Sequence, residues 1–181
     1  MKVLLVNGGP HQNGCVNTAL EEVAKELNKE NIETEIIWIG LKPIAGCIAC
    51  KKCAETGKCV FDDIVNEFVD KAKDADGFIF GSPVHYAGAT GAITSFMDRA
   101  FYSASNGGKA DRFLFKPAAT VISARRAGTT ATYDQLNKYF GINQMPIISS
   151  RYWNMVHGAT PEDVRKDEEG MQIMRSLGRN M

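Results

Sequence analysis

Short apolar runs alternate along the chain with segments in which apolar residues recur at helical spacing, and this alternation constrains the fold more than any other feature. Five runs are predicted to be strands, at residues 3–6, 32–39, 77–81, 118–122 and 146–148. The segments predicted to be helices are residues 16–30, 64–72, 91–102, 130–140 and 161–178. Short apolar strands separated by helices are typical of a parallel sheet that is buried on both faces. We therefore expect an α/β protein with a single domain over residues 1–181, built as a three-layer α/β/α sandwich.

The composition narrows the kinds of partner. The chain of 181 residues carries 21 basic and 21 acidic side chains, so no excess of positive charge draws it to nucleic acid or to an anionic membrane. No apolar run approaches the roughly 20 residues needed to cross a bilayer, and the run at residues 3–6 is too short for the core of a signal peptide. We therefore expect a cytoplasmic protein with a small-molecule partner.

Polar, glycine-rich segments follow three of the predicted strands. They are residues 7–18 (NGGPHQNGCVNT), 82–91 (SPVHYAGATG) and 123–130 (SARRAGTT). In such a sheet ligands bind beyond the carboxyl ends of the strands, and the first segment leads into a helix N-terminus whose free N–H groups suit a phosphate. Each segment alone also fits an ordinary loop, with Asn17 or Thr18 as a helix cap and Tyr86 as a surface tyrosine. Three such segments together favour a ligand site.

Three stretches resemble a known family. GGPHQNGCVNTAL, GSPVHYAGATGAITSFMDRA and ARRAGTTATYDQL are similar to the phosphate loop and the two flavin-ring loops of the flavodoxin-like NAD(P)H-dependent FMN reductases. The resemblance spans about residues 1–149, and its most specific part is the SPxxYxG run followed by the pair Asp98-Arg99. It implies a five-stranded parallel sheet in the order 2-1-3-4-5 and noncovalently bound FMN. It also implies an oxidoreductase that accepts hydride from NAD(P)H and passes electrons to a quinone, flavin or nitro compound, as a homodimer or homotetramer with FMN near the interface.

The same resemblance assigns contacts with FMN by position. The phosphate would be held by Gly9, Pro10, His11, Asn13, Asn17 and Thr18, the ring would be bordered by Pro83, Val84, His85, Tyr86 and Gly88, and its other edge by Ser123, Arg125, Arg126 and Gly128. The family usually has Ser-Pro-Arg where this chain has Gly9-Pro10-His11. Because histidine supplies less positive charge than arginine at neutral pH, we expect main-chain amides and the side chains of Asn17 and Thr18 to bind the phosphate. No catalytic side chain is expected, because the flavin N5 carries the chemistry.

Four of the five cysteines, Cys47, Cys50, Cys53 and Cys59, lie close together in the segment 46–60, called here the cysteine segment. Because thiols stay reduced in the cytoplasm, this density indicates a soft metal or redox chemistry rather than disulfides. The spacing C-x2-C-x2-C-x5-C resembles that of the iron–sulfur flavoproteins, a branch of the same fold, which implies a [4Fe-4S] cluster on these four residues. A zinc ion and a metal-free thiol loop stay as alternatives. Lys51 and Lys52 are expected to lower the pKa of nearby thiols.

Two other functions stay open at this point. One is an iron–sulfur electron carrier that exchanges electrons with ferredoxin and has no nicotinamide site, and the other is a flavin-binding redox sensor with the cysteine segment as its switch. Trp153 follows the last predicted strand, where it would either cover the flavin of a partner subunit or pack in an interface. The acidic run at residues 163–169 is interpreted as a solvated helix face.

Overall fold

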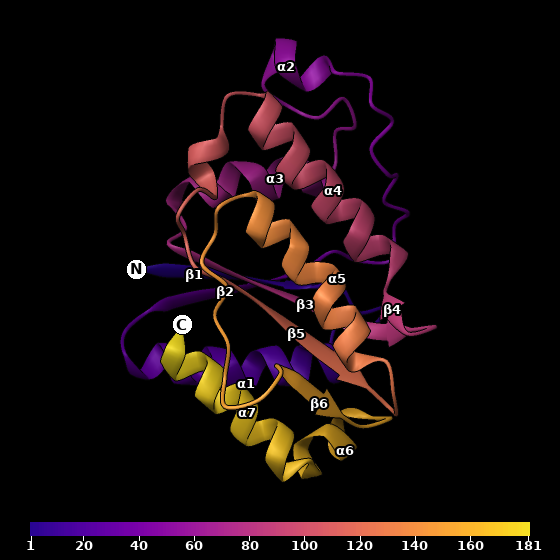
Figure 1. The fold of residues 1–181 in the computed structure, drawn as a ribbon, viewed down its shortest axis with the longest axis vertical. Helices are drawn as coiled ribbons and strands as arrows, with labels where there is room; N and C mark the ends of the chain where they lie inside the picture. The colour runs from indigo at the N-terminus through magenta and orange to yellow at the C-terminus, as the bar shows by residue number, and fades with distance from the viewer.

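A parallel sheet in the order β2-β1-β3-β5-β6 forms the centre of the computed structural model, which describes residues 1–181 (Figure 1). Its strands are β1 (Lys2–Asn7), β2 (Glu33–Trp38), β3 (Gly77–His85), β5 (Ala118–Ala124) and β6 (Met155–His157). The sixth strand, β4 (Gly88–Ala89), pairs antiparallel with the end of β3. Without β4, this is the predicted order 2-1-3-4-5, so the predicted topology is confirmed.

Helices cover both faces of the sheet (Figure 1). One face carries α3 (Ile64–Lys71), α4 (Gly91–Asn106) and α5 (Thr129–Ile142), and the other carries α1 (Cys15–Lys29) and α7 (Glu168–Asn180). The short elements are α2 (Lys52–Thr56), α6 (Pro161–Lys166) and the 3-10 turns η1 (Ala72–Asp74) and η2 (Ala110–Arg112). None of the helices is long and apolar enough to cross a membrane.

The continuous apolar strands are explained by the two cores that the sheet separates. Leu4 and Val6 of β1 point to the α3–α5 side, while Val3 and Leu5 point to the α1–α7 side. The α3–α5 core is rich in aromatic rings, and Phe68 of α3 lies within 6.0 Å, centroid to centroid, of four other phenylalanines. A fully buried side chain of this kind contributes about 1.5–3 kcal/mol through removal of its surface from water.

Two of the predicted strands differ from the observed ones. β3 does not end at Gly81 but runs through Pro83 to His85. Odd-numbered residues of β3 turn their N–H and C=O groups toward β1. Because β1 has already ended at Asn7, no strand stands opposite Pro83 on that side. The missing N–H of Pro83 therefore costs the sheet no hydrogen bond. At the far edge, residues 146–148 form only one bridge, between Ile147 and Ala118, and the regular fifth strand is β6.

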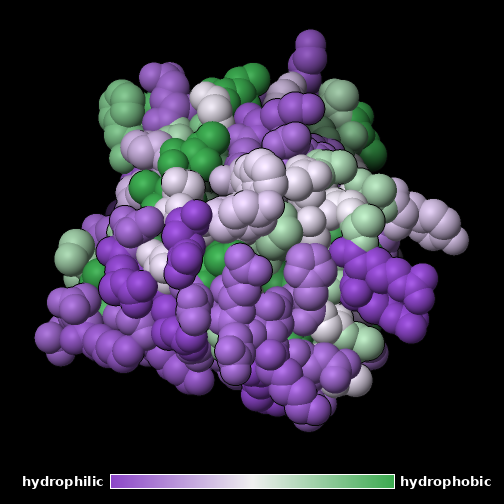
Figure 2. Space-filling model, turned by 60° about the horizontal axis from the view of Figure 1, so that its bottom comes forward, coloured by the Kyte–Doolittle hydropathy of each residue, from purple (hydrophilic) through white to green (hydrophobic).

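The predicted C-terminal helix over residues 161–178 is divided into α6 and α7 at Asp167. The backbone of Asp167 leaves the helical region, with φ −74° and ψ 82°, and its Oδ1 accepts the N–H of Gly170 at 3.0 Å as the cap of α7. Its Oδ2 accepts the N–H of His157 at 2.6 Å, which ties the break to β6. The outer surface of this side of the molecule is predominantly hydrophilic (Figure 2). Within residues 163–169, Val164 is buried, and Asp163 and Asp167 are half-buried and bond to main-chain N–H groups. The interpretation of this run as a solvated face therefore holds only for its other four residues.

Gly81 of β3 permits the close packing of α1 on the sheet, and its replacement tests this contact. A Cβ at position 81 would lie 2.6 Å from Cγ1 of Val16, so we expect Gly81→Ala to lower the free energy of unfolding by about 1–3 kcal/mol. A Cβ on Gly141 of α5 would have no atom within 4 Å. Gly141→Ala is therefore expected to raise the free energy of unfolding by about 0.5–1 kcal/mol. Urea denaturation of both variants measures the difference, and equal effects would contradict this account of the packing.

Candidate functional site

The loop between β1 and α1 is organised by Asn7, whose side chain is fully buried. Its Oδ1 accepts the N–H of Gly9 at 2.9 Å, and its Nδ2 donates to the carbonyl of Gln12 at 3.1 Å. From the end of β2, Nε1 of Trp38 donates to the carbonyl of Gly9 at 2.9 Å. α1 starts after Gly14 without a side-chain cap, so its first N–H groups are free to bind an anion at the positive end of the helix dipole.

The predicted phosphate residues divide into three groups. The concave surface at this helix start is lined by Gly9, Pro10, His11, Gly14, Cys15, Val16 and Pro83. Asn17 and Thr18 instead turn their side chains into the protein, where Nδ2 of Asn17 donates to Glu21 at 2.8 Å and Oγ1 of Thr18 donates to the carbonyl of Gly14 at 3.2 Å. Asn13 is exposed. In this structure both side chains are bonded within the protein. Their contact with a phosphate stays a prediction, as does that of the main-chain amides.

The two loops predicted to border the ring meet beyond the ends of β3 and β5. They line one open cavity with Val84, Tyr86, Ala87, Ala124, Arg125, Arg126 and Ala127. Gly128 makes the meeting possible, because its φ is +101° and a Cβ there would lie 2.8 Å from Cα of Ala87. Ser123 is buried in β5 opposite Pro83, which places the predicted residues of the two loops in register.

A tight hairpin presents Tyr86 at this cavity. Tyr86 and Ala87 both have positive φ, 49° and 58°, as the two-residue turn between β3 and β4 requires, and the tyrosine is fully exposed. Oε1 of Gln135 in α5 accepts the N–H of Ala89 at 2.9 Å and so ties the hairpin to the helix that follows the other ring loop. His85 lines a different cavity from Arg125 and Arg126, a groove shared with the first loop and residues 40–44. Gly88 packs against Oε1 of Gln135.

Four residues that organise this edge were not among the predicted site residues. Asn7, Trp38 and Gln135 hold the loops as described, and Oγ1 of Thr90 donates to the carbonyl of Gly8 at 3.2 Å. Thr90 also caps α4, where it accepts the N–H of Ile93, and a threonine before a helical segment is a signal that the sequence does contain. No local pattern distinguishes the other three from ordinary polar or aromatic residues.

The geometry of this edge fits FMN. An uncapped helix start offers N–H groups to a phosphate, and the neighbouring cavity has a cradle at Gly128 that a side chain would fill and two exposed guanidinium groups at its rim. The fold and the site together define a flavodoxin-like flavoprotein. The chain belongs to the NADPH-dependent FMN reductase family, whose model matches residues 1–160. It is an FMN-binding oxidoreductase, and the family resemblance found in the sequence is confirmed.

Known proteins similar to this chain agree with that assignment. An iron–sulfur flavoprotein of Methanocaldococcus jannaschii is 32% identical over 100% of this chain and 95% of the relative. The solved Trp repressor binding protein from Bacillus subtilis superposes with a TM-score of 0.68 at 14% identity, covering 99% of this chain and 97% of that one. A flavodoxin from the domain Archaea gives 0.59 at 13% identity, covering 99% of both chains. At these identities the two structures show the shared fold.

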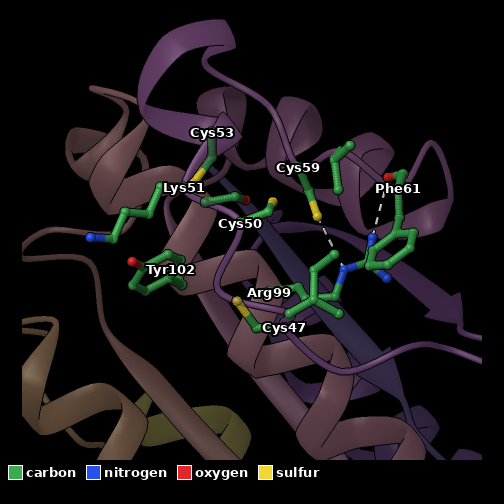
Figure 3. Close-up of a pocket in the computed structure, with 11 residues that line it drawn as sticks. Cys47, Cys50, Lys51, Cys53, Cys59, Phe61, Arg99 and Tyr102 are labelled. Atoms are coloured by element: carbon green, nitrogen blue, oxygen red, sulfur yellow. Dashed lines mark hydrogen bonds between the residues drawn. The ribbon is translucent and has the colours of Figure 1, made fainter.

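The cysteine segment forms a second candidate site, at the outer end of α4 (Figures 1 and 3). All four of its cysteines line one small, largely apolar cavity, together with Ile48, Lys51, Val60, Phe61, Arg99, Tyr102 and Ser103. Cys53 is buried, Cys59 is half-buried, and Cys47 and Cys50 are exposed. No three cysteine, histidine or acidic side chains lie close enough together to hold a metal ion. The donor chemistry and the apolar lining thus fit a soft metal centre, while the sulfurs are not gathered around one point.

The pKa of the Cys53 thiol is shifted mainly by burial and not by the neighbouring lysines. Burial raises the pKa of the Cys53 thiol and outweighs the main-chain hydrogen bonds of Cys53 and Ala54, which lower it. The nearby sulfurs of Cys50 and Cys59 add a smaller increase. The prediction that Lys51 and Lys52 lower the pKa of nearby thiols is therefore wrong for Cys53. Nζ of Lys52 forms an exposed ion pair with Glu55 at 3.0 Å.

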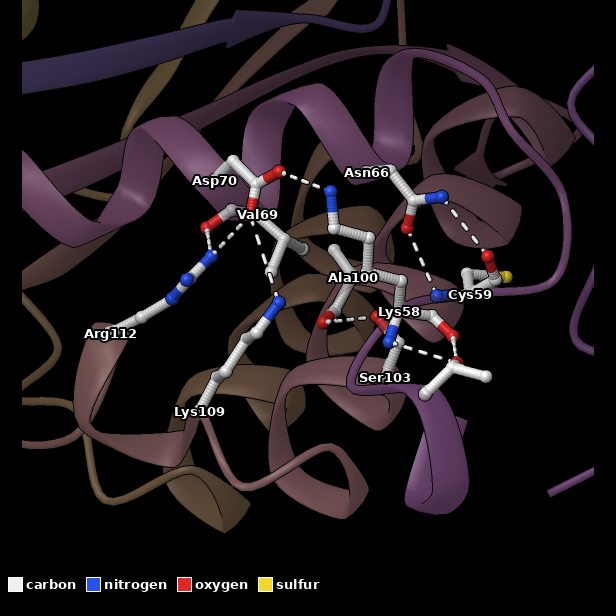
Figure 4. A network of polar contacts seen from close by, with 10 residues as sticks. Lys58, Cys59, Asn66, Val69, Asp70, Ala100, Ser103, Lys109 and Arg112 are labelled. Atoms are coloured by element: carbon white, nitrogen blue, oxygen red, sulfur yellow. Dashed lines mark hydrogen bonds and ion pairs between the residues drawn. The ribbon is translucent and has the colours of Figure 1, made fainter. Parts of the chain in front are cut away.

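Two polar side chains of α3 hold the end of the cysteine segment (Figure 4). Oδ1 of Asn66 accepts the N–H of Cys59 at 3.0 Å, and its Nδ2 donates to the carbonyl of Cys59 at 3.0 Å. One turn later, the Asp70 carboxylate lies 2.9 Å from Arg112, 3.1 Å from Lys58 and 3.7 Å from Lys109. Hydrogen bonds from Arg112 and then from Lys58 lower the pKa of Asp70 to about 2.

The tie between Gln135 and the hairpin gives a prediction for FMN affinity. Gln135→Leu removes the acceptor for the N–H of Ala89, and we expect FMN affinity to fall about tenfold as the hairpin loses its fixed position. Gln135→Glu keeps the acceptor oxygen and is expected to bind within about threefold of the parent chain. Titration of the apoprotein against FMN fluorescence measures both affinities. A loss of the same size in both variants would rule out the hydrogen bond as the cause.

The Asp70 network gives a prediction for acid stability. The folded pKa of about 2 lies below the unfolded value of about 3.9, so the ion pairs stabilise the fold above a pH of about 4, and this stabilisation is lost as the pH falls to about 2. Asp70→Asn is expected to cost about 1 kcal/mol at neutral pH, since the carboxylate is partly screened by solvent. Urea denaturation across this pH range should show the two proteins converging in acid. Asp134→Asn, at an exposed position of α5, is the control and should change little at any pH.

Proposed function

We propose that the protein accepts hydride from NAD(P)H on its FMN and passes the electrons to a small acceptor such as a quinone, a flavin or a nitro compound. The observation that carries this proposal is the open cavity between the two ring loops, beside a loop suited to the FMN phosphate. Bound there, FMN supplies a ring whose N5 takes up and releases hydride. An open cavity leaves room for a second flat molecule, which a buried flavin would not.

The side chains of the chain position the reactants and supply charge. The walls of the ring cavity contain no carboxylate and no histidine, so proton transfer from the protein is not part of the proposal. Arg125 and Arg126 are exposed at its rim, where a guanidinium would stabilise negative charge on the reduced ring or bind a phosphate of the nicotinamide nucleotide. Tyr86 borders the ring from the hairpin that Gln135 holds.

A second copy of the chain is part of this proposal. Tyr86 is fully exposed and Trp153 is 47% exposed, although large aromatic side chains usually bury most of their surface. We propose a homodimer or homotetramer that covers the ring edge, with Trp153 in the interface between copies. A subunit that closes the cavity would also exclude water from the reacting face.

The second candidate function is that of an iron–sulfur electron carrier with a [4Fe-4S] cluster on Cys47, Cys50, Cys53 and Cys59. Two observations favour it. The four thiols line one apolar cavity, and a relative of nearly the same length is named an iron–sulfur flavoprotein. A cluster held by thiolates would exchange single electrons with the flavin or with a ferredoxin. This candidate needs no nicotinamide site.

Anaerobic mixing of the FMN-loaded protein with NADH and NADPH tests the first candidate. We expect rapid bleaching of the yellow flavin band with at least one of the two nucleotides. Replacing Arg125 and Arg126 together by Gln should raise the nucleotide concentration for half-maximal rate by about tenfold or more, because charge-assisted hydrogen bonds are lost. Arg179→Gln should leave it unchanged, because Arg179 pairs with Glu26 near the end of α7, and Met181 at that end meets Gly77 at the start of β3.

The outcome that contradicts the proposal is also specific. If dithionite bleaches the flavin and neither nucleotide does, the protein is a carrier or a sensor and not an NAD(P)H oxidoreductase. Iron, acid-labile sulfide and zinc measured in the same anaerobic preparation then separate the carrier from a zinc-binding or metal-free protein.

A further inference from the structure

Asp98 and Arg99, the neighbouring pair in α4, serve different parts of the molecule. Asp98 is exposed, and its Oδ1 accepts the hydroxyl proton of Tyr139 in α5 at 2.5 Å. Arg99 turns into the cavity of the cysteine segment, and its side chain is 0% exposed. A charged group that is fully removed from water needs partners for its charge and for every N–H.

Each of the five N–H donors of Arg99 has a partner. The guanidinium forms a two-pronged ion pair with Asp63, with Nη1 and Nη2 at 2.7 and 2.8 Å from the two carboxylate oxygens. The second proton on each of these nitrogens is donated to a carbonyl, that of Ala45 at 3.4 Å and that of Phe61 at 3.2 Å. The remaining donor, Nε–H, points at Sγ of Cys59 at 3.2 Å (Figure 3). One of the four sulfurs, Sγ of Cys59, therefore accepts a hydrogen bond from a buried charged side chain.

The orientation of the Nε–H of Arg99 is set by the groups that contact the rest of its guanidinium. Asp63 is the N-cap of α3, where its Oδ1 also accepts the N–H of Val65 at 3.1 Å, so the carboxylate that orients the guanidinium plane is itself held by the helix. The guanidinium also lies 4.8 Å from the centroid of the Phe61 ring. With the plane set by Asp63 and Phe61, the direction of Nε–H follows.

The four cysteines differ in how firmly they are held. Cys59 is held at its main chain by Asn66 and at its sulfur by Arg99. Cys47 and Cys50 are exposed on irregular backbone in which Ala49 and Lys51 take positive φ, 53° and 59°. The site thus has one sulfur with a prepared position and others that have to gather around it, in agreement with the absence of a preformed group of three ligands.

We propose that Arg99 is the positioning residue of the cysteine segment, holding Sγ of Cys59 through Nε–H as the first, fixed ligand of a soft metal centre. This inference rests on the second candidate function and extends it to a residue outside the cysteine motif. Groups that hydrogen-bond to metal ligands orient them, and their loss typically lowers metal affinity by 10- to 100-fold. The alternative is that Arg99 only joins α4 to α3 through Asp63, in which case the sulfur is an incidental neighbour.

Cobalt binding to the reduced, FMN-loaded protein under anaerobic conditions separates these two roles, with Co²⁺ as the probe because its thiolate complexes absorb strongly. We expect Arg99→Lys, which keeps a positive charge beside Asp63 but loses Nε–H, to weaken Co²⁺ binding by about 10- to 100-fold. Arg175→Lys is the matched control, since Arg175 forms a 2.6 Å ion pair with Glu22 on the opposite side of the sheet, and it should bind as the parent chain does.

A double-mutant cycle supplies the readout that a structural role would not change. In a Cys59→Ala background, Arg99→Lys should have no further effect on Co²⁺ affinity, while in a Cys47→Ala background it should still weaken binding. Equal losses in both backgrounds, or parental affinity in Arg99→Lys itself, would overturn the inference. A parent chain that forms no thiolate complex with Co²⁺ would overturn this inference and the metal-bearing candidate together, while the reduction of FMN by NAD(P)H is decided separately.

A measurement on the parent chain covers the case in which Arg99→Lys does not fold. With ¹¹³Cd²⁺ bound, the N–H···S contact should transmit a scalar coupling between ¹¹³Cd and the Nε–H proton of Arg99 in ¹H–¹⁵N spectra. Cadmium bound by the thiolates without that coupling would show that Arg99 does not hold the ligating sulfur.

Discussion

The contact between the first loop and β3 is the constraint on which the rest of the structure depends. The N–H of Gly8 donates to the carbonyl of Gly81 at 2.9 Å, and a Cβ on Gly8 would lie 2.8 Å from that oxygen. Because neither position has a side chain, the end of β1, the start of α1 and the middle of β3 come together. The free N–H groups of α1 thus lie beside Pro83. The first ring loop continues from the same strand, and the second follows its neighbour β5. One ligand can then place both its phosphate and its flat ring along the same edge of the sheet.

Helix α4 joins this edge to the cysteine segment. Its cap, Thr90, is bonded to the first loop, and Arg99, about 13 Å further along the helix axis, is bonded to Cys59. A helix is stiff over that length, so the two candidate sites are placed relative to each other by one rigid element. Asp98 and Tyr139 fasten the same helix to α5, which carries Gln135 and begins at the second ring loop.

The sequence was sufficient to predict the helices and strands that show a regular spacing of apolar residues. It was insufficient where the conformation of a residue depends on a contact with a segment distant in the sequence. Continuous apolar runs were sufficient for β1, because both faces of that strand are buried. The order of the strands in the sheet came from the family resemblance. They were insufficient at Pro83, whose tolerance depends on β1 having ended, and at Asp167, which breaks a helical pattern by capping α7 and bonding to His157. In the site, the loops were found from their glycines and their positions after strands. The inward turn of Asn17 was not found, because it depends on Glu21 and Asn7 in three dimensions.

Buried polar side chains, and not the exposed charged ones, shape both candidate sites. Asn7, Asn66 and Arg99 are each at least nine-tenths buried, and each is bonded to main-chain groups of an irregular segment. No buried side-chain nitrogen or oxygen in the molecule lacks a hydrogen-bond partner. An unsatisfied buried donor is costly, so each of these residues fits only one arrangement of its loop. Irregular loops are thereby given a defined shape before any ligand arrives, and the exposed side chains at their rims, such as Tyr86 and Arg125, are left to contact what binds.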